Sequence, residues 1–206
     1  MRKVQYTIGI TGGSGSGKSF LIQALRGKFP EEELSILSQD NYYRRREEQQ
    51  RDADGIQNFD LPSSFLMDEF EHDFKQLMQG QTVTRTEYTY NNSGHTPGSM
   101  ITHPAPVMIV EGLFVLSVES IRKTLDLKVF VDASNVVKVK RRILRDRVER
   151  NYPLEDVLYR YEKHVLPAYK QFIAPYKSEA DVILNNNSSI DKALVLLSGF
   201  IRGLLG

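Results

Sequence analysis

Residues 12–19 have the sequence GGSGSGKS, which matches the pattern G-x-x-x-x-G-K-[S/T] at every defined position. An apolar run, VQYTIGI at residues 4–10, leads directly into this stretch, and an amphipathic helical pattern follows at residues 18–29. Glycines allow successive backbone N–H groups to turn inward and face an anion at the N-terminus of a helix. The stretch therefore predicts a phosphate-binding loop between a strand and a helix, in a nucleotide-binding protein.

Each residue of this loop has an expected role. Lys18 is expected to reach the β- and γ-phosphates of a nucleotide, and the Ser19 hydroxyl to bind Mg²⁺. The remaining loop residues are expected to surround the phosphate groups: Gly12, Gly13, Ser14, Gly15, Ser16 and Gly17. A flexible loop that happens to precede a lysine would not explain the strand before it and the helix after it.

Short aliphatic runs alternate with helical patterns along the chain. Runs this short and apolar suit parallel strands that are covered on both faces. The predicted strands are 4–10, 35–38, 107–110, 127–131 and 181–184, and the predicted helices are 18–29, 63–79, 134–150, 154–173 and 189–205. This alternation predicts an α/β fold, a three-layer sandwich of the P-loop NTPase type around a central parallel sheet.

Two segments are predicted to be additions to this alternation. Residues 82–103 contain an alternating run, a turn rich in Gly and Asn, and a second short run, which predicts an inserted β-hairpin acting as a flap. Residues 134–152 are predicted to form a helical lid. The charged tract at 44–55 is predicted to be a mobile surface loop. The length of 206 residues suits a single domain spanning residues 1–206.

The composition excludes several classes of function. Lys and Arg number 27 against 26 acidic residues, so neither nucleic acid nor an anionic membrane is an expected partner. Disulfides, thiolate catalysis and cysteine-based zinc sites are excluded because the chain has no cysteine. No window approaches the roughly 18 uninterrupted apolar residues of a membrane span. We therefore expect a soluble, cytoplasmic protein.

A phosphate-binding loop alone leaves GTPases, ATP-driven machines, sulfotransferases and kinases open. A D-x-x-G match occurs at residues 52–55, but it follows a charged tract instead of an apolar strand, and no N-K-x-D is present. No LSGGQ-type signature of ABC ATPases occurs either. These observations favour a small α/β kinase.

Two carboxylates follow predicted strands. Glu111 comes directly after VMIV and suits the metal side of the site, where a carboxylate can hold a metal-bound water. Asp40 follows SILSQ and opens the aromatic stretch DNYY at residues 40–43. Because the carboxyl ends of parallel strands face the ligand crevice, Asp40 could accept the proton of an attacking hydroxyl. A turn or capping aspartate is the alternative for Asp40, and a plain strand end is the alternative for Glu111.

The predicted lid helix is strongly basic. It carries seven basic residues within thirteen positions: Lys138, Lys140, Arg141, Arg142, Arg145, Arg147 and Arg150. Arginines on a closing helix can neutralise the charge that spreads over the transferring phosphoryl oxygens. A solvated charged face explains part of the set, so we expect two or three of the seven to be functional.

Taken together, these segments resemble the uridine–cytidine kinase family, relatives of phosphoribulokinase. The resemblance extends from about residue 7 to residue 185 and rests on GGSGSGKS, ILSQDNYY (36–43), NFDLPSSF (58–65), IVEGLF (109–114), KVFVDAS (128–134), RRILRDRVER (141–150) and KSEADVIL (177–184). The pairing of SQD-x-Y-Y with N-F-D-x-P is far more specific than the phosphate-binding loop alone.

The resemblance implies roles on the ATP and metal side. Asp40 matches the family's catalytic aspartate, close to Mg²⁺ and to the acceptor's 5′-hydroxyl. Glu111 matches the acid on the metal side. Arg145 falls on a lid arginine near the ATP phosphates, which makes it a catalytic and ATP-binding candidate together with Lys18. Arg150 falls on a further lid arginine and is an ATP-binding candidate.

The resemblance also implies roles on the acceptor side. Asp60 occupies the position that holds the ribose hydroxyls, and Tyr88 matches the tyrosine that packs on the pyrimidine base. Arg142 falls on the lid arginine near the substrate. Two further candidates for acceptor binding are Tyr42, in the aromatic stretch at 40–43, and His95, in the turn of the predicted hairpin.

Several acceptor-side positions depart from the family pattern. Ser93 stands where the family has the histidine that hydrogen-bonds the base, and His95 lies two residues later. Thr89 stands where an aspartate is usual, Tyr152 where an arginine is usual, and Arg160 where a glutamine is usual. A changed set of polar partners is expected to change the acceptor or its base preference.

These features predict an ATP- and Mg²⁺-dependent kinase that phosphorylates a hydroxyl of a small metabolite, most simply the 5′-OH of a pyrimidine nucleoside. A sugar, sugar phosphate or hydroxy acid remains an alternative acceptor, and Arg160 would suit one that carries negative charge. A nucleotide-binding regulator without kinase activity is a second alternative. The resemblance also suggests a homo-oligomer.

Overall fold

The computed structural model describes residues 3–89, 97–148 and 151–206, and its centre is a five-stranded sheet. The strands lie in the order β2-β5-β1-β6-β7, and every neighbouring pair is parallel. Their bounds are Tyr6–Thr11 (β1), Leu34–Ser38 (β2), Val107–Glu111 (β5), Leu127–Asp132 (β6) and Val182–Asn185 (β7). The predicted α/β fold with a parallel sheet is confirmed.

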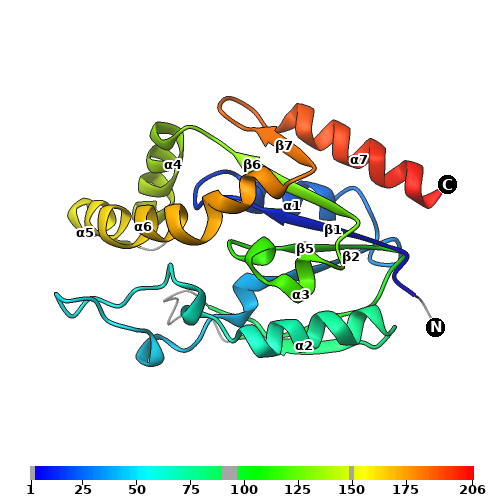
Figure 1. The fold of residues 1–206 in the computed structure, drawn as a ribbon, viewed down its shortest axis with the longest axis horizontal. Coiled ribbons are helices and arrows are strands. Elements are labelled where there is room, and N and C mark those ends of the chain that lie inside the picture. Colours follow the sequence, from blue (N-terminus) through cyan, green and yellow to red (C-terminus); the bar gives the residue numbers. More distant parts are fainter. Residues whose placement is uncertain (1–2, 90–96, 149–150) are drawn as a thin grey trace.

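Helices cover both faces of this sheet (Figure 1). On one face lie α1 (Lys18–Arg26) and α7 (Asp191–Leu205), and on the other lie α2 (Met67–Met78) and the short α3 (Glu119–Arg122), which was not predicted. Successive residues of β5 point alternately to the two cores, with Val107 and Ile109 toward α1 and Met108 and Val110 toward α2. Burial on both faces explains why the strand sequences are continuously apolar.

The predicted hairpin is present as a separate two-stranded antiparallel sheet. Its strands are β3 (Val83–Thr86) and β4 (Ser99–Thr102), so both are shorter than the alternating pattern suggested. Residues 90–96, which include Ser93 and His95, lie outside the described ranges.

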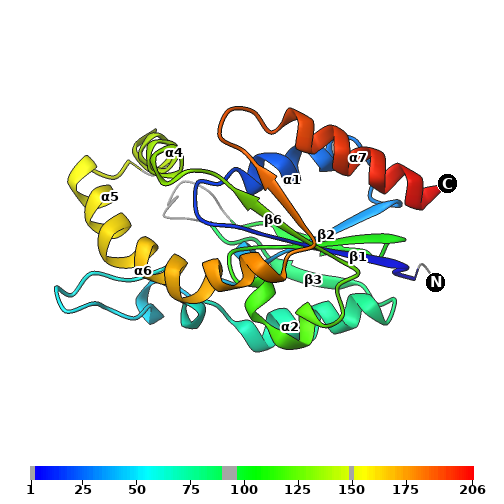
Figure 2. The same cartoon turned by 45° about the horizontal axis from the view of Figure 1, so that its top comes forward.

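The lid consists of several helical pieces at the end of the sheet where the phosphate-binding loop lies (Figure 2). It begins with α4 (Asn135–Val148), which is shorter than the predicted 134–152. The predicted single helix at 154–173 instead contains α5 (Leu154–Arg160), a π-helical turn (Tyr161–Val165), α6 (Leu166–Ala168) and a second π-helical turn (Tyr169–Ile173). In an α-helix, the N–H of residue 167 would bond the carbonyl of residue 163, and that of residue 175 the carbonyl of residue 171. Both carbonyls lie inside the π-helical turns. Because Pro167 and Pro175 have no N–H, these bonds are missing and the helix widens there.

Three other boundaries differ from the sequence prediction. α2 begins at Met67 because Pro62–Ser64 forms a 3₁₀ turn, in which the Ser64 hydroxyl donates to the Asn58 carbonyl at 2.8 Å. α7 begins at Asp191, two residues later than expected. The charged tract at 44–55, predicted to be a mobile loop, is instead bonded to the protein: Gln49 is buried and donates to the carbonyls of Arg44 and Ser64.

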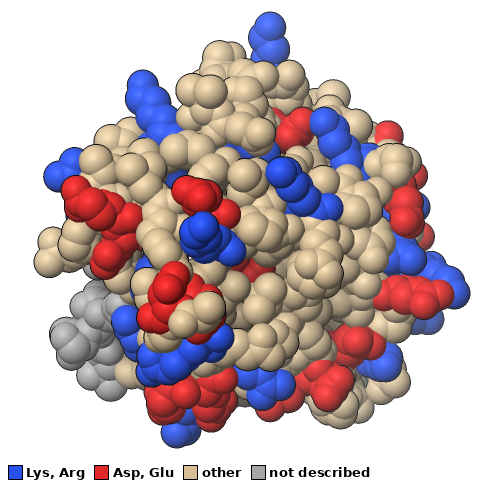
Figure 3. Space-filling view, turned by 60° about the vertical axis from the view of Figure 1, so that its left-hand side comes forward, with Lys and Arg blue, Asp and Glu red and all other residues tan. Residues whose placement is uncertain are grey.

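The surface agrees with the nearly neutral composition. Lys and Arg side chains are intermixed with Asp and Glu side chains over the face shown in Figure 3, without a large area of one sign. Within the described ranges, no helix is long and apolar enough to cross a membrane.

Candidate active site

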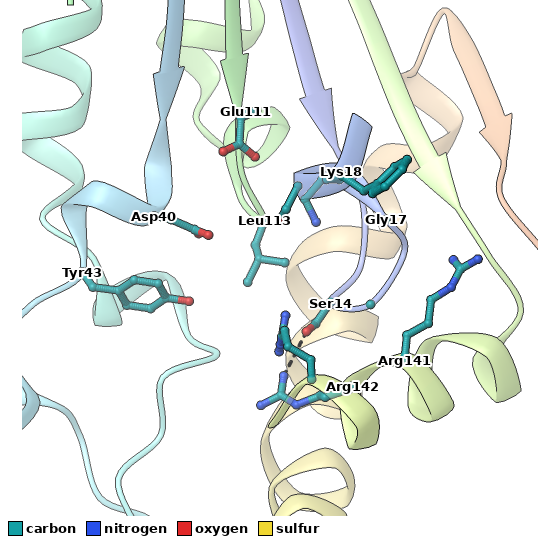
Figure 4. Close-up of a pocket in the computed structure, with 13 residues that line it drawn as sticks. Ser14, Gly17, Lys18, Asp40, Tyr43, Glu111, Leu113, Arg141 and Arg142 are labelled. Carbon is teal, nitrogen blue, oxygen red and sulfur yellow. Dashed lines mark hydrogen bonds between the residues drawn. The ribbon is translucent and has the colours of Figure 1, made fainter. Parts of the chain in front are cut away.

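A cavity of about 260 Å³ lies at the carboxyl ends of the strands (Figure 4). The phosphate-binding loop, the ends of β2 and β5, and the lid helix α4 all contribute to its wall. Its lining residues are Ser14, Gly15, Gly17, Lys18, Ser19, Phe20, Asp40, Tyr43, Glu111, Leu113, Arg141, Arg142 and Arg145. The structure therefore brings together the predicted catalytic and metal-binding residues and two of the predicted lid arginines.

The phosphate-binding loop is fixed by close packing against the lid. Gly15 has φ +78°, and a Cβ atom there would lie 2.5 Å from the carbonyl oxygen of Lys138 on α4. Only glycine fits a left-handed position with backbone this close. The carbonyl of Ser16 accepts a hydrogen bond from Asn186 Nδ2 at 2.8 Å. No side chain caps the N-terminus of α1, so its first N–H groups are available to an anion.

Lys18 is held by the loop that it belongs to. Its Nζ donates to the carbonyl of Gly12 at 2.6 Å and to that of Gly13 at 3.3 Å. Burial lowers the pKa of Lys18 to about 8, although the nearby carboxylates of Glu111 and Asp40 oppose this shift. The ammonium group thus lies within the phosphate-binding loop, opposite the two carboxylates.

Glu111 ends β5 and is buried beside Asp40. Burial, and then the charge of Asp40, raise the pKa of Glu111 to about 7, while the Ser38 hydroxyl donates a hydrogen bond to its carboxylate. A carboxylate with this pKa changes its charge near neutral pH, and a nearby cation would strongly stabilise its ionised form.

A buried glutamine links the segments that carry these two acids. Gln39 is fully buried, and its Oε1 accepts a hydrogen bond from the backbone N–H of Phe114 at 2.9 Å. The chain after β5 passes so close that a Cβ atom on Gly112 would lie 2.4 Å from the Cβ of Gln39. Gln39 and Gly112 therefore set the separation of Asp40 and Glu111.

Replacing Glu111 by glutamine should stabilise the protein above neutral pH when metal and nucleotide are absent. The folded protein binds the Glu111 proton more tightly than the unfolded chain does, so stability falls as pH rises from about 4.5 to about 7. Glu111→Gln removes this loss, and the free energy of unfolding should rise by roughly 2–3 kcal/mol at pH 8 and change little at pH 4. Urea denaturation in EDTA measures this, with the exposed Glu155→Gln as the matched control. Equal stability of Glu111→Gln and the parent at pH 8 would show that the ionised Glu111 carboxylate does not destabilise the folded protein.

The lid arginine Arg142 connects three parts of the site. Its Nη1 donates to the Ser14 hydroxyl at 3.0 Å and to Asp60 at 3.2 Å, and its Nε lies 3.0 Å from Asp146. Arg142, Asp60 and Asp146 are all buried. On the same helix, Arg145 Nε donates to Asp146 at 2.9 Å. Asp60 is thus held at the junction of lid and phosphate-binding loop.

Of the two tyrosines in the stretch 40–43, Tyr43 lies on the cavity wall and the predicted Tyr42 does not. Tyr42 is buried, and its hydroxyl donates to Asp73 at 2.7 Å. The Tyr43 ring packs beside the predicted base-binding Tyr88, with centroids 5.1 Å apart, and on Phe65 at 4.0 Å. The 3₁₀ turn Gln39–Tyr42 ends before Tyr43, whose backbone is extended (φ −59°, ψ 135°), so the two tyrosines point in different directions. The sequence itself carries no signal that distinguishes them.

Other candidate residues lie elsewhere or are not described. His95 and Arg150 fall outside the described residues, as does Ser93. Two positions that depart from the family pattern contact each other away from the cavity: the Arg160 guanidinium lies 5.3 Å from the centroid of the Tyr152 ring. Phe20 and Leu113 line the cavity without having been predicted.

A sequence profile described as "Phosphoribulokinase / Uridine kinase family" matches residues 7–193. The chain belongs to this family. A uridine kinase of Streptococcus equi subsp. zooepidemicus is 34% identical over 206 residues, which is 100% of this chain and 99% of the relative. A uridine kinase of Streptococcus gordonii is 35% identical over 198 residues, which is 96% of this chain and 94% of the relative.

Solved structures of the phosphoribulokinase/uridine kinase family show the same fold. Phosphoribulokinase from Rhodobacter spheroides matches with a TM-score of 0.62 and 21% identity, covering 89% of this chain and 70% of that chain. A possible uridine kinase from Bacillus stearothermophilus matches with a TM-score of 0.55 and 20% identity, covering 89% and 90%. The chain is a uridine-kinase-like P-loop kinase that acts on a nucleotide and a small molecule.

Proposed function

We propose that the chain transfers the γ-phosphoryl group of ATP to the 5′-hydroxyl of a pyrimidine nucleoside. The observation that carries the proposal is that one cavity contains both the phosphate-binding loop with Lys18 and, facing it, Asp40 and the ring of Tyr43 (Figure 4). Full-length relatives named uridine kinase support the choice of acceptor.

On the donor side, the N–H groups at the start of α1 and the Lys18 ammonium group bind the phosphates. Lys18 exchanges the carbonyls of Gly12 and Gly13 for phosphate oxygens, which also compensates its buried charge. Arg145 and Arg141 line the same cavity and neutralise the charge on the transferring group. Arg150 is proposed to bind the ATP phosphates with them.

The residues present fit a Mg²⁺ ion. The described residues contain no cluster of three or more carboxylate, histidine or cysteine side chains that could hold a metal alone. Mg²⁺ keeps several waters and takes one or two carboxylates together with substrate phosphates, which suits Ser19, Asp40 and Glu111. A bound Mg²⁺ would neutralise charge on the phosphate oxygens and reduce the repulsion between the Asp40 and Glu111 carboxylates.

On the acceptor side, Asp40 accepts the proton as the hydroxyl oxygen attacks the γ-phosphorus and ADP leaves. The rings of Tyr43 and Tyr88 pack on the nucleoside base, and Asp60 accepts hydrogen bonds from the ribose hydroxyls. Arg142 holds Asp60 until the acceptor arrives. Tyr42 supports this wall from the core through Asp73, and His95 is proposed to bind the base.

The contacts of Arg160 favour a neutral acceptor. Its Nη1 donates to the carbonyl of Gln57 at 2.7 Å, and the guanidinium faces Tyr152. The guanidinium is therefore already engaged by the protein and does not line the cavity. A nucleoside fits this arrangement better than an acceptor that already carries a phosphate.

Replacing Asp60 should weaken acceptor binding selectively. Asp60→Asn removes the charge that accepts hydrogen bonds from the ribose, so the KM for the acceptor should rise roughly 10–100-fold. The KM for ATP should change less than about twofold, because the phosphate-binding loop is intact. Initial-rate kinetics with each substrate varied give the comparison, with the exposed Asp68→Asn as control. A rise confined to the KM for ATP would remove Asp60 from the acceptor site.

The experiment that tests the proposal is an acceptor screen with ATP and Mg²⁺. Uridine, cytidine, other nucleosides, pentoses and sugar phosphates are each supplied, and ADP release is followed by a coupled assay. Pyrimidine nucleosides should give turnover far above the ATPase background. Turnover with sugars or sugar phosphates alone would overturn the nucleoside acceptor, and background rates with every acceptor would overturn kinase activity.

We also propose that residues 1–206 act as a single kinase domain in the cytoplasm and that the enzyme is a homo-oligomer. Analytical ultracentrifugation of the purified chain tests the last point, since a monomer at micromolar concentration would contradict it.

A further inference from the structure

Residues 50–60, called here the acceptor loop because they end at Asp60, lie against α5 and the π-helical turn that follows it (Figures 1 and 2). Asp52 is the main contact. Its Oδ2 accepts hydrogen bonds from the Tyr159 hydroxyl at 2.9 Å and from His164 Nε2 at 2.7 Å. The Tyr159 hydroxyl also lies 2.5 Å from Asp54. His164 is buried and Asp52 is partly exposed, so the contact lies at the edge of the protein interior.

The π-helical turn makes this arrangement possible. Residues five apart do not share a face of an α-helix, whereas a turn with i→i+5 hydrogen bonds brings them closer to alignment. Tyr159 and His164 are five apart, and their rings meet edge to face with centroids 5.9 Å apart. The widened helix thus directs both side chains to the same carboxylate.

A second contact leads directly toward Asp60. Arg160 Nη1 donates to the carbonyl of Gln57 at 2.7 Å. The next residue, Asn58, accepts a hydrogen bond from the backbone N–H of Asp60 through its Oδ1 at 2.9 Å. Two hydrogen bonds and the peptide bond between Gln57 and Asn58 therefore link the Arg160 guanidinium to the backbone of Asp60. Through these bonds Arg160 can determine where Asp60 lies.

The other end of the loop is bonded to the lid as well. Asp60 pairs with Arg142 of α4, Arg142 pairs with Asp146, and the Asp146 carbonyl accepts a hydrogen bond from the N–H of Tyr152 at 3.0 Å. Tyr152 in turn faces Arg160. The contacts form a closed ring through α4, α5 and the acceptor loop.

We infer that Tyr159, Arg160 and His164 are positioning residues that fix the acceptor loop to the lid and hold Asp60 in place for the acceptor. None of the three lines the cavity, so they act through Asp52 and Gln57 and not by touching the acceptor. Loop and lid then move as one body. The kinetic part of this inference rests on the proposed function, whereas the attachment of the loop does not.

The kinetic test uses two variants that each remove one contact. Tyr159→Phe deletes a single hydroxyl, and Arg160→Met deletes the guanidinium while keeping an unbranched chain. Each should raise the KM for the acceptor about tenfold, the factor expected from loss of a hydrogen bond to or from a charged group. The kcat and the KM for ATP should change less than about twofold. Arg160→Lys keeps a cationic donor and should restore most of the loss, and the exposed Arg202→Met on α7 is the control.

The structural test needs no substrate. Arg51 is exposed beside three other arginines at 44–46, so trypsin can cut this region whenever it detaches from the lid. The rate of cleavage at native conditions reports the population of the detached state. Tyr159→Phe and Arg160→Met should each be cut there about tenfold faster than the parent, and Arg202→Met at the parental rate.

Each outcome decides the inference. Faster cleavage together with a raised acceptor KM supports it. Unchanged cleavage shows that the loop is not held by these residues, and faster cleavage with an unchanged acceptor KM removes their positioning role; either result overturns it. If the parent phosphorylates no acceptor, the proposed function fails, while the cleavage rates still show whether the loop is fixed to the lid.

Discussion

Asp40→Asn is expected to lower kcat about 10²–10⁴-fold while ATP still binds, because the amide cannot accept the proton of the attacking hydroxyl. Asp40 lies at the end of β2, where the cavity separates it from the phosphate-binding loop (Figure 4). The substitution keeps size and shape, so Tyr43 and Gln39 beside it should keep their positions.

Two measurements make this expectation specific. Titration with a non-hydrolysable ATP analogue should give a Kd within a few-fold of the parent, and the exposed Asp156→Asn should have parental kinetics. A parental kcat for Asp40→Asn would exclude Asp40 from the proton transfer.

Lys18→Met is expected to reduce kcat by about 10²–10³-fold and to weaken ATP binding as well. Methionine fills much of the same volume but provides no charge for the phosphates. The metal-free protein should lose little stability, since the buried ammonium group has its pKa lowered to about 8 by burial and gains only two carbonyl contacts.

Kinetics and denaturation together test this substitution. The exposed Lys28→Met, two residues beyond α1, is a matched control with the same change in charge. If Lys18→Met lowered activity only in proportion to the fraction of unfolded protein, the loss would be structural, and the catalytic role of Lys18 would be wrong.

Much of the fold could be predicted because its determinants are local in the sequence. The phosphate-binding loop is a contiguous pattern, and continuously apolar strands such as residues 107–110 follow from burial on both faces. The hairpin was predictable for the same reason, since its alternation and its turn lie within one segment. Asp40 and Glu111 could be placed in one site because parallel strands end at a common edge.

Two pairings that were not predicted depend on contacts between distant segments. The pairing of Asp60 with Arg142 joins residues 82 positions apart, and that of Asp52 with His164 joins residues 112 apart. No periodic pattern in the sequence indicates which of these distant residues will pair. Two other features are local: the position of Tyr43 on the cavity wall, in place of Tyr42, depends on where a short 3₁₀ turn ends. The π-helical turns follow from Pro167 and Pro175, whose effect on a long helix could have been considered from the sequence.

The contact between Gln39 and Gly112 has a consequence for how this protein can be altered. A side chain at position 112 would occupy the space of the Gln39 side chain, and a smaller residue at 39 would leave the N–H of Phe114 without its acceptor. Gly112 also has φ +159°, a backbone conformation that residues with a Cβ atom rarely adopt, so a smaller residue at 39 would not by itself admit a side chain at 112. Single substitutions at either position are therefore expected to fail, and a mutagenesis library that varies 39 and 112 together should still return only glycine at 112. The approach of the two acid-bearing segments is thus limited by the backbone at 112 and not only by the space beside Gln39.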